Sequence, residues 1–524
     1  MSSSPAPTRR SLLGGAGALG VAGAVGGAVA APAYAGPWTP ARFPGAKLLT
    51  APDRHLVGRF SYGLTPALAA QVRRRGGARR WFEWQLAPER IPDPTAASLR
   101  TWWSGLDRGA QELWSRQTSE IEYGWAVMED YQRYLLLRRT RGQHQVLEVM
   151  TEFWENHLHV PVNGDAQFTH RVPYGDLVRR HALGTYEDLL REAITHPAML
   201  VYLNQAVSTK RRPNENLARE LLELHTVGRG RFTEDDVKSS ARILTGWSVD
   251  LWRTWRASYQ PERHWTGPVR VMGFHDPNAA ADGRELTHRY LRHLARHPAT
   301  AQRIARKLAC KFVRDDPPQS LVDHLAAVYL AHDTAIKPVL RALVAHRGFR
   351  ASAGLKVKDP GEDAVSTYRA LRVRIARPPE GERGEQYAAN AILWQTAALG
   401  TTPFEWPRAD GQPVDSASWS SPSRMIASLE LHYTLSGGWW PTAGTGYRRP
   451  GQWLPRRRIR FDMLVDHLCQ QLLGRRSTAT LLKACSEAVG VGRREVITRE
   501  HDLVRWSMPR LLTTLLDSPY HLRK

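Results

Sequence analysis

The chain has 524 residues, of which 42% are apolar and 19 are tryptophan, a composition that excludes a disordered protein and predicts a packed globule. Its formal net charge is +23, which fits either contact with anionic envelope polymers or a solvated surface whose charge is incidental. Three cysteines, Cys310, Cys469 and Cys485, allow one disulfide at most, and their spacing excludes a zinc finger.

The first 35 residues have the pattern of a twin-arginine export signal. Arg9 and Arg10 precede a run rich in Gly, Ala and Val, and Ala33-Tyr34-Ala35 forms a cleavage site of small residues. That run is too weakly apolar for a transmembrane anchor, and no later segment approaches the roughly 18 apolar residues that a span needs. We therefore expect a signal peptide at 1–35, passage through the twin-arginine translocase, and a mature protein outside the cell or in its envelope. A stable transmembrane anchor and a nucleic-acid partner are not expected.

Beyond residue 53, apolar residues recur at intervals of three and four, which predicts amphipathic helices. The predicted helices are 65–75, 111–139, 143–159, 186–204, 214–226, 234–247, 300–313 and 320–330. Aromatic and β-branched residues between 252 and 273 predict a hairpin, and strand patterns are scarce elsewhere. The expected fold is mainly α: one large multi-helix globular domain with few short strands over 36–524, with any subdivision falling near 350–390.

The predicted helix 143–159 has a polar stripe. At about 100° per residue, Glu148, Glu152, Glu155 and His159 lie on one face, and His157 lies on the apolar face opposite. Carboxylates spaced this closely repel one another unless something positive faces them. Arginines, a metal ion or water would each satisfy them, and the sequence leaves the three alternatives open.

The predicted helix 214–226 has a second polar stripe, and Asn214 is its expected N-cap. The stripe consists of Glu215, Asn216, Arg219, Glu220 and Glu223, while His225 lies on the apolar face. One interpretation is an ion-pair ladder around Arg219, with His225 as a hydrogen-bonded core residue. The other is that these side chains hold a ligand.

The dipeptide His275-Asp276 lies in a predicted loop, where an exposed imidazole beside a carboxylate suits acid-base chemistry or metal binding. No HExxH, GxSxG or P-loop sequence is present. This absence counts against the common zinc proteases, serine hydrolases and nucleotide-binding proteins.

Together these motifs resemble the bacterial domain-of-unknown-function family numbered 1800. The blocks that carry the resemblance are 153–157 (FWENH), 180–186 (RHALGTY), 197–200 (PAML), 213–226 (PNENLARELLELHT), 232–234 (FTE), 241–247 (ARILTGW), 275–276 (HD), 298–301 (PATA) and 517–520 (DSPY). The sequence departs from the family pattern at Asn204-Gln205, where Asp-Asn is expected, and at 405–407, a shortened Gly-Trp-Pro-like segment. The first departure removes an acidic residue at Asn204 as a candidate.

The resemblance implies a helical fold and export, without a settled activity. Members of the family are found beside secreted proteins of a sulfatase- or phosphatase-like family, which implies shared work on envelope or extracellular polymers. The family block also places Asn156 and His157 at the site, whereas periodicity favours the opposite face of the same helix. Glu155 belongs to both sets.

Our leading hypothesis is an exported, metal-assisted hydrolase or transferase that acts on an extracytoplasmic polymer. The expected ligands of a divalent metal are Glu155, His157, Glu220, Glu223 and His225. His275 and Asp276 would act in catalysis, and Arg219 would hold an anionic substrate. The alternatives are a non-catalytic protein that binds cell-wall polysaccharide or a secreted partner enzyme, and a redox protein.

Overall fold

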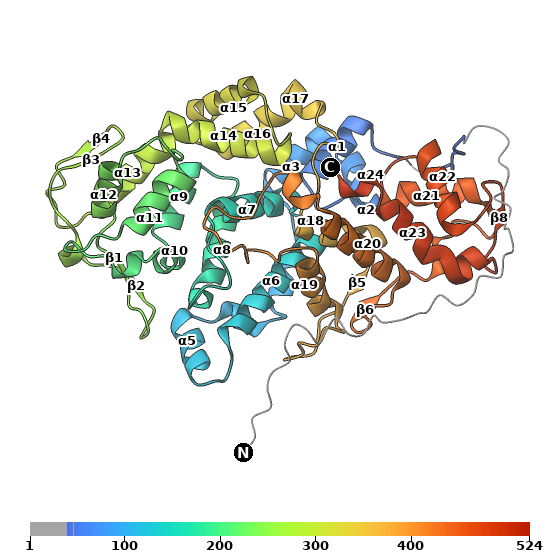
Figure 1. The fold of residues 1–524 in the computed structure, drawn as a ribbon, viewed down its shortest axis with the longest axis horizontal. Coiled ribbons are helices and arrows are strands. Elements are labelled where there is room, and N and C mark those ends of the chain that lie inside the picture. Colours follow the sequence, from blue (N-terminus) through green and yellow to red (C-terminus); the bar gives the residue numbers. More distant parts are fainter. Residues whose placement is uncertain (1–38, 46) are drawn as a thin grey trace, which may run out of the picture. The chain divides into compact units, whose positions relative to one another are not determined.

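The computed structural model describes residues 39–45 and 47–524, so the signal peptide expected at 1–35 lies outside the described residues. Helices dominate the described part of the chain, and the strands form only short pairs (Figure 1). The predicted mainly α fold is confirmed. No helix in this part of the chain is long and apolar enough to cross a membrane.

The helices are numbered in chain order. The first twelve are α1 (Ala51–Arg59), α2 (Pro66–Arg74), α3 (Ala78–Gln85), α4 (Pro94–Arg100), α5 (Ala110–Thr118), α6 (Gly124–Arg141), α7 (Gln145–His157), α8 (Arg171–His181), α9 (Tyr186–Ile194), α10 (Pro197–Tyr202), α11 (Glu215–Glu220) and α12 (Glu234–Ile243). The others are α13 (Arg284–Arg296), α14 (Pro298–Phe312), α15 (Gln319–Ala331), α16 (Ile336–Ala345), α17 (Arg347–Arg350), α18 (Pro360–Leu371), α19 (Ala388–Ala398), α20 (Pro422–Gly437), α21 (Phe461–Leu472), α22 (Ala479–Val489), α23 (Met508–Leu516) and α24 (Pro519–Leu522).

The strands form four antiparallel pairs, each of two strands. They are β1 (Trp247–Val249) with β2 (Ala257–Tyr259), β3 (Val269–Val271) with β4 (Phe274–Asp276), β5 (Arg374–Ile375) with β6 (Thr445–Gly446), and β7 (Ile459–Arg460) with β8 (Val496–Ile497). The hairpin expected between 252 and 273 is therefore two hairpins, β1–β2 and β3–β4. Trp247, expected at the end of a helix, begins β1 instead.

Two predicted helices are each divided in the structure. The helix expected at 111–139 is α5 and α6, because Glu120 between them has a φ of 56°, and a left-handed residue cannot continue a right-handed helix. The helix expected at 186–204 is α9 and α10, divided before Pro197, which has no N–H to donate to the preceding turn. Apolar periodicity continues across both breaks, which is why the sequence pattern does not reveal them.

Helix α7 is enclosed on several sides, because it packs against α3, α6 and α8 (Figure 1). Val146, Met150 and Trp154 on its apolar face are fully buried, and the indole nitrogen of Trp154 donates a hydrogen bond to the carbonyl of Ala182, at 3.0 Å. The side chains of the opposite, polar face are buried as well. Any charge on α7 must therefore be neutralised by neighbouring side chains rather than by water.

Helix α18 lies in the region 350–390, where a subdivision was expected. It packs against α6, far earlier in the sequence, and against α19, α20 and α21, the three helices that follow it. A capping box between Asp359 and Glu362 fixes its first turn. Residues Thr39–Lys524 form one compact unit in the structure, with α18 among its internal helices.

Candidate functional site

Arginine and lysine side chains neutralise the acidic stripe of α7. Glu148 accepts from Arg138 at 2.6 Å and from Arg179 at 2.9 Å. Burial alone would raise the pKa of Glu148, but these two guanidinium groups outweigh it and lower the pKa to about 2. Of the three alternatives for this stripe, the structure shows pairing with arginine.

The two other carboxylates of the stripe are paired in the same way. The side chain of Glu152 lies 3.2 Å from that of Arg139 and 3.6 Å from the ammonium group of Lys311. Glu155 lies 3.3 Å from Arg171 and accepts a hydrogen bond from the hydroxyl of Tyr131. These buried pairs connect α7 to α6 and α8. The acidic stripe is thus structural, and the candidate site lies at the C-terminal end of α7.

The second polar helix is α11, which continues as a π-helical turn, Leu221–His225. Wider turns of this kind occur frequently at functional sites because they shift the faces on which side chains lie. Arg219 points away to Glu234, at 2.6 Å, and also lies 3.6 Å from Glu215. The expected ladder around Arg219 therefore reaches Glu215 but not Glu223.

Glu220 and Glu223 are both half-buried. Burial, together with the neighbouring Glu223, raises the pKa of Glu220. Glu223 accepts from the guanidinium Nε of Arg229 at 2.8 Å. The two carboxylates thus share one turn, and Glu223 is the one that lines a cleft.

His157 and His225 hold the end of α7 against the π-helical turn. The Nδ1–H of His225 donates to the carbonyl of His157, at 3.0 Å, and the Nε2–H of His157 donates to the carbonyl of His225, at 3.1 Å. The hydroxyl of Tyr186 also donates to the latter carbonyl. This reciprocal pairing fixes the tautomers and leaves Nδ1 of His157 as an acceptor.

Lys307, on α14, donates a hydrogen bond to that acceptor, and its Nζ lies 2.9 Å from Nδ1 of His157. Within the described part of the chain Lys307 forms no ion pair with a carboxylate. Burial, reinforced by the nearby Arg303, lowers its pKa to about 7. A lysine amine that is half neutral near pH 7 can accept a proton from a substrate or from water.

A cleft of about 620 Å³ opens beside this pair. Its walls come from the end of α7, the π-helical turn, α14 and the loop 408–418. Basic side chains of Arg229, Arg303 and Arg408 line it together with Lys307, and Glu223 and Asp410 lie among them. Asp410 pairs with Arg408 and Glu223 with Arg229, whereas Arg303 forms no ion pair in the described part of the chain.

Asn156 fastens the loop 408–418 to α7. Its Nδ2 donates to the carbonyl of Gln412, at 2.8 Å, and the backbone N–H of Gln412 donates to its Oδ1, at 2.7 Å. Gly411 makes this close approach, because a Cβ there would lie 2.2 Å from the carbonyl oxygen of Asn156, and its φ is 75°. The family-block residue Asn156 therefore lines the cleft and also shapes it.

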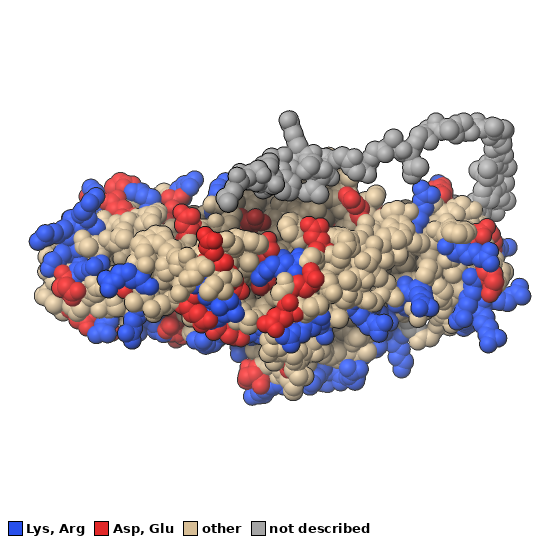
Figure 2. Space-filling model, turned by 90° about the horizontal axis from the view of Figure 1, so that it is seen from below, with Lys and Arg blue, Asp and Glu red and all other residues tan. Residues whose placement is uncertain are grey.

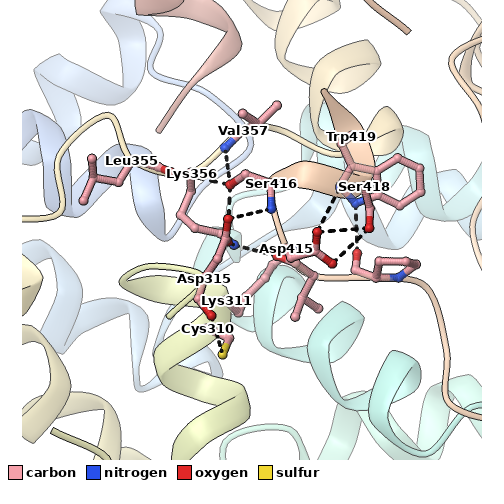
Figure 3. A network of polar contacts seen from close by, with 12 residues as sticks. Cys310, Lys311, Asp315, Leu355, Lys356, Val357, Asp415, Ser416, Ser418 and Trp419 are labelled. Carbon is pink, nitrogen blue, oxygen red and sulfur yellow. Dashed lines mark hydrogen bonds and ion pairs between the residues drawn. The ribbon is translucent and has the colours of Figure 1, made fainter. Parts of the chain in front are cut away.

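The other end of this loop is fixed by the network that Figure 3 shows. Oδ2 of Asp315 accepts from the backbone N–H of Ser416, at 3.0 Å, and Oδ1 accepts from the ammonium group of Lys356. Lys356 also donates to the carbonyl of Val414, at 2.6 Å. Contacts at Gln412, Val414 and Ser416 thus hold this wall of the cleft in place.

We expect Asn156→Leu to loosen the loop, because it keeps the side-chain volume and removes both hydrogen bonds. Backbone amides of 408–418 should exchange at least about tenfold faster, and the free energy of unfolding should fall by about 1–3 kcal/mol. Hydrogen exchange followed by mass spectrometry measures the first effect. Asn216→Leu, at an exposed position of α11, is the control and should leave the loop unchanged; equal exchange in both variants would show that Asn156 does not hold it.

His225 makes the protein sensitive to acid. Burial lowers its pKa to about 3, despite the hydrogen bond to His157, so the folded protein keeps it neutral while the unfolded chain takes up a proton below pH ~6.5. Its contribution to stability is present above pH ~6.5 and is lost as the pH falls toward 3, at up to about 1.4 kcal/mol per pH unit. Urea unfolding at pH 7 and pH 5 measures this slope.

His225→Asn keeps a donor to the carbonyl of His157, and we expect it to reduce the acid dependence by close to one proton. His275→Asn, at an exposed position, should leave the dependence as it is. If the two variants show the same slope, the acid sensitivity does not come from His225.

His275 and Asp276 lie on the hairpin β3–β4 and do not line the cleft. His275 is exposed, opposite Arg270 in the strand register. Asp276 pairs with Arg289 at 2.6 Å and accepts from the backbone N–H of Asn278. The structure therefore brings His157, Glu223 and the turn of His225 together, and it leaves this dipeptide and Arg219 on other surfaces.

The residues expected to bind a divalent metal do not form a compact ligand set in the described part of the chain. The sets of three potential ligands whose atoms lie within 4.8 Å of one another are Asp363, His432 and His521, and Glu152, Asp359 and Glu362. Cationic side chains already contact both sets: Arg424 lies 3.0 Å from Asp363, and Lys311 lies 3.0 Å from Glu362. A divalent metal in this protein stays a prediction, with the expected ligands Glu155, His157, Glu220, Glu223 and His225. Elemental analysis of protein purified from its native export route tests it.

Comparison with known proteins identifies a family and no individual relative. No curated protein and no solved structure matches the chain. One family model covers residues 55–523, which includes every element that lines the cleft. The chain therefore belongs to the family described as "Protein of unknown function (DUF1800)".

Proposed function

We propose that this protein is an exported hydrolase or transferase that acts on an anionic extracytoplasmic polymer, with Lys307 as its general base. The observation that carries the proposal is the contact between Lys307 and His157, at 2.9 Å, on the wall of an open cleft. A paired surface lysine would stay protonated, whereas this one has a lowered pKa and no carboxylate partner in the described residues.

In the proposed reaction the neutral amine of Lys307 takes a proton from water or from an acceptor hydroxyl as that oxygen attacks the polymer. The resulting ammonium group then gives the proton to the leaving oxygen, which returns Lys307 to its starting state. His157 keeps the amine in place, because its Nε2–H is held by the carbonyl of His225 and its Nδ1 can only accept. Neither histidine changes its protonation state in this scheme.

Arg303 is the proposed contact for the anionic group of the polymer. Its Nε donates to the carbonyl of Leu224, at 3.0 Å, which fixes the guanidinium at the cleft wall. Because Arg303 has no carboxylate partner in the described residues, an anionic ligand would not have to displace one. Arg229 and Arg408, which are more exposed and already paired, would assist at the edge of the cleft.

The location and partners in this proposal rest on the sequence. The twin-arginine pattern at Arg9 and Arg10 supports export by the twin-arginine translocase. The net charge of +23 supports contact with anionic envelope polymers, and a secreted sulfatase- or phosphatase-like protein is the proposed partner enzyme.

The test is incubation of the purified protein with uronate-, phosphate- and sulfate-bearing polysaccharides, followed by chromatography for shorter chains and new chain ends. We expect one class to be shortened or modified, and we expect Arg303→Gln to raise KM more than it lowers kcat. Saturable binding with no change in any polymer would contradict an enzyme and would support the non-catalytic, polysaccharide-holding alternative.

A further inference from the structure

A second pocket, which shares no lining residue with the cleft, has an unusual charge composition. It has a volume of about 390 Å³ and lies among the ends of α2, α6 and α18. Four arginines line it, namely Arg74, Arg141, Arg369 and Arg372. No aspartate or glutamate lines it, and none of these four arginines forms an ion pair within the described residues.

Arg369 is a half-buried arginine on the wall of the pocket. Its Nη1 donates to the carbonyl of Thr140, at 2.8 Å, while its Nε is buried and has no hydrogen-bond partner among residues 39–45 and 47–524. Burial lowers the pKa of Arg369 to about 10, with no neighbouring carboxylate to offset the effect. An unpaired donor of this kind is costly unless a ligand or water satisfies it.

Helix dipoles explain part of this arrangement but not all of it. Basic residues are favourable at helix C-termini, and all four arginines lie at or near the C-terminal ends of α2, α6 and α18. Each helix end contributes roughly half a negative charge, so three ends supply about −1.5 against four guanidinium charges. A surplus of more than two positive charges remains in one pocket.

Net charge alone does not mark such a site. On the face that Figure 2 shows, basic side chains are widely spread and acidic side chains lie among them. The second pocket differs because its basic side chains have no acidic neighbours on its walls. The polar groups around them are uncharged: Thr65, Gln71, Gln143 and Tyr368.

We propose that this pocket binds a phosphate or sulfate group carried by a saccharide. Guanidinium groups match the tetrahedral oxyanion, with two parallel N–H donors each. The volume exceeds that of a single oxyanion, and the surrounding amides and hydroxyls suit the hydroxyls of a sugar ring. The site is distinct from the cleft of Lys307, and its occupation does not depend on the proposed reaction.

The test is isothermal titration with inorganic phosphate, inorganic sulfate and glucose 6-phosphate at constant ionic strength. It starts from the protein carrying Lys307→Met and Arg303→Gln, so that binding in the cleft is removed. We expect saturable binding of one equivalent, tighter for the sugar phosphate than for the inorganic ions. Adding Arg74→Gln and Arg372→Gln, both at exposed positions, should weaken it at least tenfold.

Arg211→Gln with Arg270→Gln is the matched control, because it removes the same charge from exposed positions outside the pocket. It should leave the affinity within twofold. Three outcomes would overturn the inference: no saturable binding to either the unchanged or the cleft-disabled protein, equal weakening by the control pair, or binding to the unchanged protein that the cleft-disabled protein lacks. The last would assign the anion site to the cleft.

Discussion

Lys307→Met is expected to lower kcat on the proposed polymer substrate by at least about 100-fold, the usual contribution of a general base. Methionine keeps the length and the apolar stem of lysine but cannot accept a proton. The protein should remain folded, because Lys307 has no ion pair in the described residues and its charged form is disfavoured by burial. Initial rates together with urea unfolding separate loss of chemistry from loss of structure.

Two controls make this result specific. Lys307→Arg keeps a positive charge but cannot become neutral near pH 7, so it should be as inactive as the methionine variant if proton transfer is the role. Lys210→Met, on an exposed loop, should retain full activity. Full activity of Lys307→Arg would mean that the residue supplies only charge, and full activity of Lys307→Met would remove it from the mechanism.

The second large effect is expected at Asp363, which is fully buried at the start of α18. Its carboxylate accepts from Arg424 at 3.0 Å, from Ser428 at 2.7 Å and from His432 at 3.1 Å. Burial would raise the pKa of Asp363, but the charges of His432 and Arg424 hold it well below its ordinary value. Asp363→Asn should cost about 3–5 kcal/mol of unfolding free energy, because it leaves the buried Arg424 without its counter-charge and leaves His432 with Asp517 alone.

Denaturant unfolding at pH 7 measures this loss, with Asp235→Asn on the exposed first turn of α12 as the control. The control should stay within about 0.5 kcal/mol of the unchanged protein. A loss below about 1 kcal/mol for Asp363→Asn would show that water or rearranged neighbours stabilise the buried cations, which the observed packing does not predict.

The sequence predicts the polar face of α7 correctly but not its partners. Glu148, Glu152 and Glu155 share a face because helical geometry is local, and local geometry is readable from spacing. Their partners Arg138, Arg139 and Arg171 lie on α6 and α8. Whether arginine, a metal ion or water neutralises these carboxylates depends on how α6 and α8 pack against α7. The residue pattern of one helix holds no information about that packing.

Lys307 was missed for a similar reason. Within α14 it lies between Ile304 and Leu308, and nothing in the spacing separates it from a solvent-facing lysine at the edge of an apolar stripe. Its environment is set by α7, about 150 positions away in the sequence, and by the loop 408–418. The same-helix neighbour Arg303, one turn earlier, is the only local hint.

For His275 and Asp276 the residue types predict a shared acid-base site, but their positions in the structure do not support one. An adjacent imidazole and carboxylate look like an acid-base pair, yet neighbouring residues of a strand point to opposite faces. In β4, Asp276 pairs with Arg289, and His275 is exposed. Adjacency in a sequence is therefore weak evidence for a shared site when the segment is extended.

The proposed base must be about half neutral near pH 7, and the titration of Lys307 tests this most directly. Trace labelling with acetic anhydride from pH 5 to pH 11, followed by digestion and mass spectrometry, gives the reactivity of each lysine. We expect Lys307 to titrate with a pKa of about 7, well below the ordinary lysine value of about 10.4. If Lys307 instead titrates near that ordinary value, it is protonated at neutral pH and cannot be the base.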